Sequence, residues 1–139
     1  MAIRFFSDGT SFQPKAKRKL TQWLKKVAVR EGKITGRLGY VFVPDEVILN
    51  LNKQYLQHDH YTDIITFDDS SGNIISGEMY ISVDTVKANA EEYQVDFSNE
   101  LQRVMVHGLL HLCGYKDHTA EEQKEMRAKE DKYLVLYMA

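Results

Sequence analysis

The sequence predicts an α+β fold, with a small mixed β-sheet of about four strands packed with about five helices. Four runs rich in β-branched and aromatic residues read as strands, and the segments between and after them have apolar residues at helical spacing. The predicted order is β, α, β, α, β, β and then three helices. No repeat or linker interrupts the 139 residues, so we expect a single domain over residues 1–139.

The first half of the chain predicts two strand–helix pairs. Residues 3–6 form a short strand that ends at turn residues, and a helix follows Pro14. That helix has an apolar stripe at helical spacing, made of Ala16, Leu20, Trp23, Leu24 and Val27. Residues 37–43 form the second strand. Pro44 then begins a second helix, where its missing N–H has no intrahelical partner to lose.

The second half predicts a hairpin and three helices. The β-branched run over residues 62–67 predicts a central strand, and residues 74–82 predict its antiparallel partner. The helices are expected over residues 83–93, about 98–113 and 119–136. Thr119 and Glu122 form the capping box that begins the last of them.

Composition and charge restrict the classes of function. Hydrophobic residues make up 43% of the chain, and no apolar run is long enough to span a membrane. A single cysteine, Cys113, and the absence of a secretion signal predict the cytoplasm. Residues 1–37 contain ten Lys and Arg against two acidic residues, whereas the rest of the chain is acidic. The basic segment is either a phosphate-binding surface or a solvated helix face.

Three of the five histidines lie within twelve residues, in the stretch HGLLHLCGYKDH. His107 and His111 are four residues apart, so a helix places both rings on one face, where they could bind one metal ion. Gly114 predicts the end of that helix and a turn that brings His118 back toward the pair. Three histidines leave one open position on zinc, as in catalytic sites. The alternative is an ordinary helix whose histidines form hydrogen bonds.

The position directly after the first histidine indicates which hydrolytic chemistry is available. Zinc proteases of the HExxH type have a glutamate there, whereas this chain has Gly108, which disfavours peptidase chemistry. A general base must then come from Asp117, beside the third histidine, or from Glu78 in the hairpin. Alternatively the metal alone could lower the pKa of a bound water to about 7.

The histidine stretch resembles the signature HGxLHLxGYDH of the YbeY family of metal-dependent single-strand endoribonucleases and ribosomal RNA maturation factors. Residues 51–55 and 61–67 resemble the family's LN..Y…TDVLSF block, and residues 76–82 resemble its GDI.IS strand. The resemblance implies that His107, His111 and His118 are zinc ligands. We expect His107, His111 and Asp117 to form the catalytic site, with Asp117 as a candidate base. The resemblance also implies the α+β fold.

The chain departs from the family pattern at two places. Lys116 reads as an insertion before Asp117 and His118, with Asp117 as the fallback ligand. Leu56 stands where the family has an arginine thought to contact substrate phosphate. We expect another cation to compensate for it, and the candidates are Lys53, His58, His60 and Lys116.

The resemblance therefore implies a hydrolase, a zinc-dependent endoribonuclease that cuts single-stranded ribosomal RNA during ribosome maturation, with one zinc ion and with ribosomal particles as partners. The RNA-binding residues expected from the charge pattern are Lys17, Arg18, Lys25, Lys26, Lys53 and Lys116. A ribosome-assembly factor with a structural zinc site is the alternative, and a zinc hydrolase of amides is a third hypothesis. Nickel or cobalt would also suit a three-histidine site.

Overall fold

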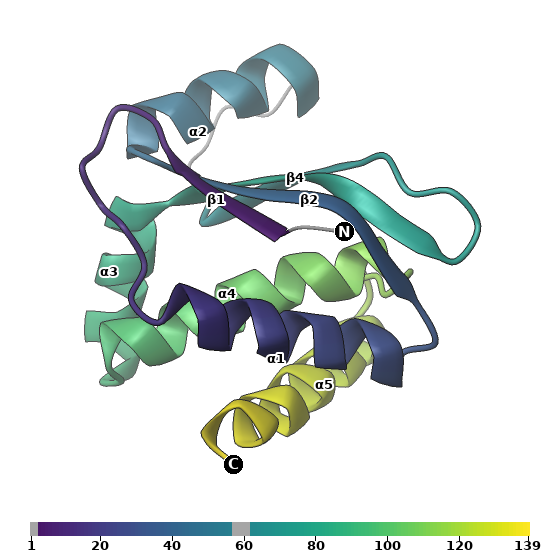
Figure 1. The fold of residues 1–139 in the computed structure, drawn as a ribbon. Helices are drawn as coiled ribbons and strands as arrows, with labels where there is room; N and C mark the ends of the chain where they lie inside the picture. Colours follow the sequence, from purple (N-terminus) through teal and green to yellow (C-terminus); the bar gives the residue numbers. More distant parts are fainter. Residues whose placement is uncertain (1–2, 57–61) are drawn as a thin grey trace.

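A computed structural model describes residues 3–56 and 62–139 of the chain. Within these residues, four strands form one mixed sheet (Figure 1). The order of the strands across the sheet is β1-β2-β4-β3, with β1 and β4 parallel to β2, and β3 antiparallel to β4. The strands are β1 (Ile3–Ser7), β2 (Ile34–Val43), β3 (Ile64–Asp68) and β4 (Ile74–Ser82). The predicted α+β class with a mixed sheet is therefore confirmed.

The described residues also form five α-helices, and α1, α4 and α5 lie on the opposite side of the sheet from α2 (Figure 1). The helices are α1 (Lys17–Arg30), α2 (Asp45–Leu51), α3 (Val83–Tyr93), α4 (Phe97–Leu112) and α5 (Ala120–Met138). A five-residue π-helix, η1 (Asn52–Leu56), continues α2. Within the described ranges, no helix combines the length and the apolar character that crossing a membrane requires.

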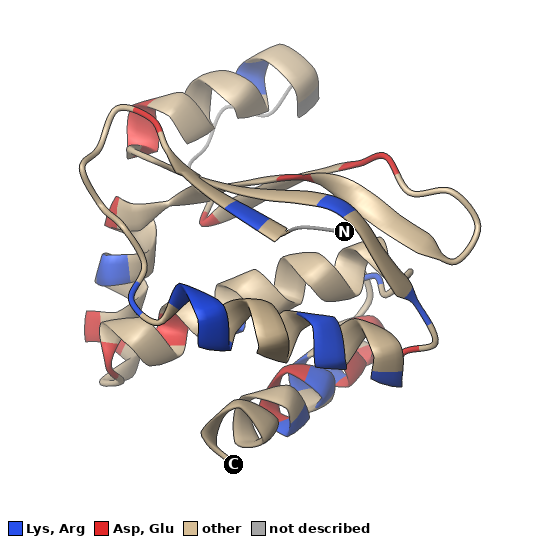
Figure 2. Ribbon diagram, in the orientation of Figure 1, with Lys and Arg blue, Asp and Glu red and all other residues tan. Residues whose placement is uncertain are grey.

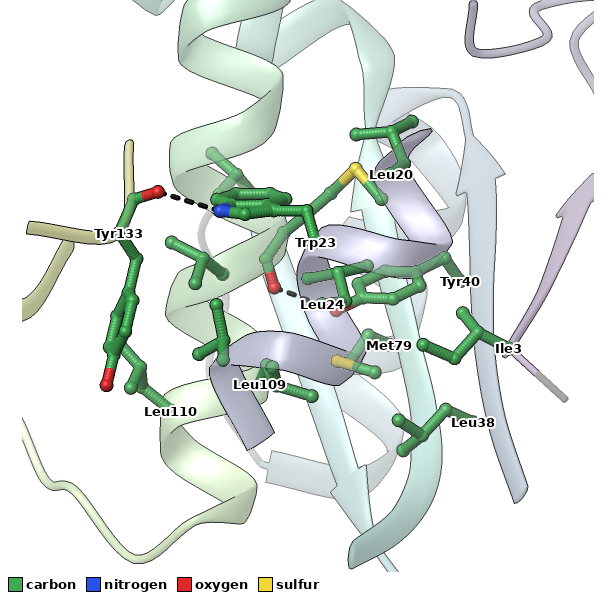
Figure 3. Packing of buried hydrophobic residues seen from close by; sticks show 14 of the residues in the cluster. Ile3, Leu20, Trp23, Leu24, Leu38, Tyr40, Met79, Leu109, Leu110 and Tyr133 are labelled. Atoms are coloured by element: carbon green, nitrogen blue, oxygen red, sulfur yellow. Dashed lines mark hydrogen bonds between the residues drawn. The ribbon is translucent and has the colours of Figure 1, made fainter. Parts of the chain in front are cut away.

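The main core lies between the sheet and α1, α4 and α5 (Figure 3). Trp23 retains only 3% of its exposed surface, and burying such a side chain contributes roughly 1.5–3 kcal/mol or more. Its Nε1–H donates to the backbone carbonyl of Tyr133 at 2.7 Å, and the Tyr40 hydroxyl donates to that of Met105 at 2.9 Å. These two bonds satisfy the polar atoms of two buried aromatic side chains. They also join α1 to α5 and β2 to α4.

The prediction that residues 62–67 form a central strand is wrong, because β3 lies at the edge of the sheet. Its composition nevertheless has a physical reason. Ile65 belongs to a small second core with Ile48 of α2, while Ile64 packs against the main core on the other face. Both faces of β3 are covered, so its sequence has the apolar character of an internal strand.

The helix end and the turn after α4 form as the sequence predicts, although the turn does not bring His118 to the histidine pair. Gly114 has φ = 109°, a left-handed value that glycine adopts readily, and its N–H donates to the carbonyl of His111. The N–H of Tyr115 then donates to the carbonyl of Leu110 at 3.1 Å, which closes the helix end. The capping box of Thr119 and Glu122 begins α5, as expected. A short loop, residues 113–119, therefore connects two firmly capped helices.

Candidate metal centre

The last two turns of α4 place His107 and His111 side by side. Their Nε2 atoms are 2.9 Å apart, and both side chains are partly exposed. This proximity follows from the spacing of four residues, because side chains at i and i+4 lie one above the other on a helix. The predicted helical histidine pair is thus present, with both Nε2 atoms directed to one point.

Asp117 lies against both histidines. Its Oδ2 is 3.4 Å from Nε2 of His107 and 3.4 Å from Nε2 of His111. Among the described residues, these three are the one group of His, Cys, Asp and Glu side chains close enough together to share a metal ion. The turn at Gly114 reverses the chain and brings the carboxylate back over the helix end.

His118 does not join this group. Its side chain is exposed, and its backbone N–H donates to Glu122 Oε1 at 3.2 Å, so it belongs to the start of α5. The third histidine of the signature HGxLHLxGYDH stands ten residues after the first, and ten residues after His107 the chain has Asp117. Aligned without an insertion, Asp117 therefore takes the position of the third histidine, and the structure places it beside the other two donors. The expectation that Lys116 is an inserted residue is not needed to align the chain with the signature.

The spacing of the three donor atoms fits a bound divalent cation. Zinc binds histidine nitrogen and carboxylate oxygen at about 2.0–2.2 Å, so donors in a tetrahedral site lie roughly 3.3 Å apart. The three separations here are 2.9, 3.4 and 3.4 Å. Two imidazoles and one carboxylate are also donor types that zinc accepts in catalytic sites. The residues present therefore suit the metal that the sequence predicts.

The second nitrogen of each imidazole is fixed by a hydrogen bond. His107 Nδ1 is 2.6 Å from Glu130 Oε2, and His111 Nδ1 is 2.9 Å from the carbonyl oxygen of Tyr115. A carboxylate and a carbonyl accept, so each Nδ1 carries the proton and each Nε2 lone pair is free to bind a metal. Such outer partners orient metal-binding histidines and raise their basicity.

Glu130 is a functional candidate that the sequence analysis missed. It lies on α5, and its side chain retains only 6% of its exposed surface. The sequence carries a signal for it, because Glu130 occupies the buried stripe of α5 with Met126, Tyr133 and Leu134. A carboxylate at an otherwise apolar helix position requires a buried partner.

Glu130 is held by charges on both sides. Arg103 donates to Glu130 Oε1 at 2.9 Å and to Asp131 at 2.7 Å, while the exposed Arg127 lies 3.6 Å from Glu130. Burial would raise the pKa of Glu130, but hydrogen bonds from His107 and Arg103 lower it. Burial would lower the pKa of His107, and the bond and charge of Glu130 outweigh this and raise it. Glu130 is therefore ionised beside the imidazole.

The two residues predicted as candidate general bases, Asp117 and Glu78, lie in different parts of the structure. Asp117 lies at the histidines, whereas Glu78 lines a groove of about 810 Å³ with Arg4, Phe6 and Arg37. Residues alternate between faces along a strand, so Glu78 faces away from Met79 and the helix-covered core. Partial burial raises the pKa of Cys113 to about 11, so its thiol is protonated near neutral pH.

The predicted RNA-binding residues are dispersed over the surface. Lys17, Arg18 and Lys26 are exposed on α1 and Lys25 is half-buried there, in the basic part of the chain (Figure 2). Lys53 is exposed on η1, and Lys116 is exposed directly before Asp117. His58 and His60 lie outside the described residues. The structure does not bring the α1 cations to the histidine pair, and RNA binding by these residues stays a prediction.

Comparisons with known proteins match nearly the whole chain. A family model described as "Endoribonuclease YbeY" matches residues 5–137. A protein of that name from Bacteroides thetaiotaomicron is 45% identical over 98% of this chain and 99% of its own length, and one from Parabacteroides distasonis is 46% identical over 98% and 96%. The solution structure of TM1509 from Thermotoga maritima aligns with a TM-score of 0.64 at 30% identity, and covers 96% of this chain and 87% of that one.

Proposed function

The chain belongs to the endoribonuclease YbeY family, and from that premise we propose that it is a metal-dependent endoribonuclease acting on single-stranded ribosomal RNA during ribosome maturation. The observation that carries the proposal is the convergence of His107 Nε2, His111 Nε2 and Asp117 Oδ2 on one point. We further propose one cytoplasmic domain over residues 1–139, with zinc as the metal and ribosomal particles as partners.

Each residue of the centre has a defined part. His107 and His111 would hold the metal through Nε2, with Glu130 and the Tyr115 carbonyl fixing their orientation. Asp117 would be the third donor, or would take a proton from the attacking nucleophile if a different group completes the site. Zinc held by three such donors acts as a Lewis acid toward a phosphate oxygen and activates water near neutral pH.

The third donor can be identified by comparing Asp117→Ala with His118→Ala. We expect Asp117→Ala to weaken zinc binding at least tenfold, because it removes a donor 3.4 Å from both imidazoles, and His118→Ala to bind as the parent does. Competition with a chromophoric chelator measures both. A large loss in His118→Ala with none in Asp117→Ala would restore the three-histidine site that the resemblance implies.

The activity is tested by cleavage of a single-stranded ribosomal RNA fragment by zinc-loaded protein, beside His111→Ala as the matched control. We expect cleavage by the parent and none by the variant, because the variant lacks one of the two adjacent imidazoles. Equal cleavage by both proteins would reveal a contaminating nuclease and would contradict an activity located at this centre. No cleavage by a zinc-confirmed parent would favour the assembly factor.

The assembly factor with a structural zinc site remains the second candidate because of Leu56, the last residue of η1. A leucine offers no charge to the phosphate in the transition state, where cations contribute much of the catalysis. Such a protein would bind ribosomal particles and leave RNA intact. Zinc removal would then lower its melting temperature, and neither the zinc-loaded nor the zinc-free protein would cleave RNA.

The basic face of α1 is proposed to hold the RNA backbone. Replacing Lys17, Arg18, Lys25 and Lys26 with glutamine should weaken RNA binding and flatten its dependence on salt, since each phosphate contact contributes to the salt slope. Glutamine at Lys124 and Lys132 of α5 is the matched control for a change of surface charge. Equal salt slopes for the α1 variant and the parent would remove α1 from the RNA-binding surface.

A further inference from the structure

Glu31, the residue that follows α1, accepts three hydrogen bonds from parts of the chain that are distant in sequence. The Tyr115 hydroxyl donates to Oε1 at 2.6 Å, and the Tyr133 hydroxyl and Lys129 Nζ both donate to Oε2, the latter at 3.2 Å. Only 9% of the Glu31 side chain is exposed. We define Glu31, Tyr115, Lys129 and Tyr133 as the Glu31 cluster. It joins the end of α1, the loop after α4 and the middle of α5.

The Glu31 cluster contacts the metal centre through Tyr115. The hydroxyl of Tyr115 is bound by Glu31, and its backbone carbonyl accepts the hydrogen bond from His111 Nδ1 at 2.9 Å. Lys129, which also binds Glu31, has its Nζ 5.5 Å from the centre of the Tyr115 ring. One residue therefore connects a buried carboxylate to the imidazole of a proposed metal ligand.

The same residue also limits where Asp117 can lie. Tyr115 is two positions before Asp117, and beyond Asp117 the capping box of Thr119 and Glu122 fixes the chain. Gln123 Nε2 donates to the carbonyl of Asp117 at 3.1 Å, which adds a second restraint on that side. The loop is thus anchored at both ends, and Glu31 supplies the side-chain anchor at its beginning.

We infer that Glu31 is a positioning residue for the metal centre, acting through Tyr115 on the orientation of His111 and the placement of Asp117. The inference rests on the proposed function, because it needs a metal at the histidine pair. Outer partners of metal ligands commonly change metal affinity by 10–100-fold. Glu31 acts one residue further out, so its loss should weaken zinc binding about tenfold, near the low end of that range.

A purely structural role for the cluster makes a different prediction, and Tyr133 separates the two. Tyr133 donates to the same carboxylate from α5, and within the described part of the chain its hydroxyl forms no hydrogen bond to the histidines or their loop. Tyr133→Phe should therefore lower stability and leave zinc affinity within about twofold of the parent. Tyr115→Phe removes the one hydroxyl that connects Glu31 to the loop, and should weaken zinc binding as much as Glu31→Gln does.

The experiment measures zinc dissociation constants by chelator competition at a temperature where all proteins are folded. The proteins are the parent, Glu31→Gln, Tyr115→Phe, Tyr133→Phe and the double variant that combines Glu31→Gln with Tyr115→Phe. Cobalt-loaded samples provide a visible spectrum that reports ligand geometry. We expect about tenfold weaker binding and an altered spectrum in both single variants. The double variant should bind no more weakly than either, since residues that act through one contact are not additive.

The outcomes distinguish this inference from the proposed function. Loss of binding in His111→Ala with unchanged affinity in Glu31→Gln and Tyr115→Phe would overturn the inference and leave the metal centre intact. Absence of zinc binding by the parent would overturn both. If Glu31→Gln does not fold, Tyr115→Phe against Tyr133→Phe decides, and equal zinc affinities in those two proteins would overturn the inference.

Discussion

At the scale of single residues, the centre depends on a buried carboxylate that the sequence places on an apolar helix stripe. Glu130 accepts from His107 Nδ1 at 2.6 Å and from Arg103 at 2.9 Å, so its charge is compensated on two sides. Without those partners a carboxylate buried to this extent would cost several kcal/mol. The arrangement makes Glu130 a strong acceptor for the imidazole proton and leaves Nε2 as the donor to a metal.

Glu130→Gln tests this residue directly. The amide has nearly the same size but no charge, so it accepts more weakly from His107 and leaves Arg103 incompletely paired. We expect zinc affinity to fall roughly 10–100-fold, as measured by competition with a chelator. Asp131→Asn is the matched control, because Asp131 also binds Arg103 but is 59% exposed and does not contact the histidine. Equal affinities for the two variants would contradict the role of Glu130.

At the scale of elements, α4 lies close against the sheet at Gly108. A Cβ at this position would meet Ile64 Cδ1 of β3 at 2.8 Å and Met79 Sδ of β4 at 2.9 Å. The glutamate that the HExxH proteases have at this position would therefore collide with the sheet. The close approach also packs the histidine-bearing part of α4 against Ile64, the first residue of β3.

Gly108→Ala is expected to destabilise the protein even though alanine is the better helix former. In an open helix the change would stabilise by about 1 kcal/mol, but overpacking a tight contact costs about 1–3 kcal/mol. Urea unfolding should show a lower midpoint for Gly108→Ala. Gly39→Ala is the control, because a Cβ there meets its nearest atom at an ordinary 3.6 Å. A midpoint at or above that of the parent would show that the sheet can shift at no cost.

At the scale of the whole molecule, the Glu31 cluster joins segments that are about 84–102 residues apart in sequence. Burial would raise the pKa of Glu31, but hydrogen bonds from Tyr115, Tyr133 and Lys129 lower it below the ordinary value of 4.5. A carboxyl whose pKa is lowered by folding contributes stability above its unfolded pKa. This stability is lost as the pH falls through the lower value of the folded state.

The free energy of unfolding should therefore fall on acidification below about pH 4.5, and Glu31→Gln should show a smaller fall than the parent. The difference arises because glutamine does not titrate. Chemical unfolding of the metal-free protein at a series of pH values between 3 and 7, a range set by this pKa shift, measures it. Glu121→Gln, at an exposed position on α5, serves as the control. Parallel curves for Glu31→Gln and the parent would contradict the lowered pKa.

The sequence by itself determined the features that depend on neighbours within a few residues. Helical spacing predicted α1 and the paired histidines of α4, the left-handed preference of glycine predicted the turn at Gly114, and the Thr119 to Glu122 pattern predicted the start of α5. These predictions succeed because helix periodicity, capping and turn conformations are decided locally. The overall class of the fold followed from the order of such segments.

Tertiary structure alone decided which distant groups meet. It placed β3 at the sheet edge, because covering both faces of a strand produces the same composition as a central position. It showed that Asp117 lies at the histidines and that His118 does not, although the count of ten residues from His107 already points to Asp117. It also paired His107 with Glu130 and Tyr115 with Glu31, across 23 and 84 residues. No local pattern encodes such pairings, because they arise only when packing of the core fixes the helices against one another.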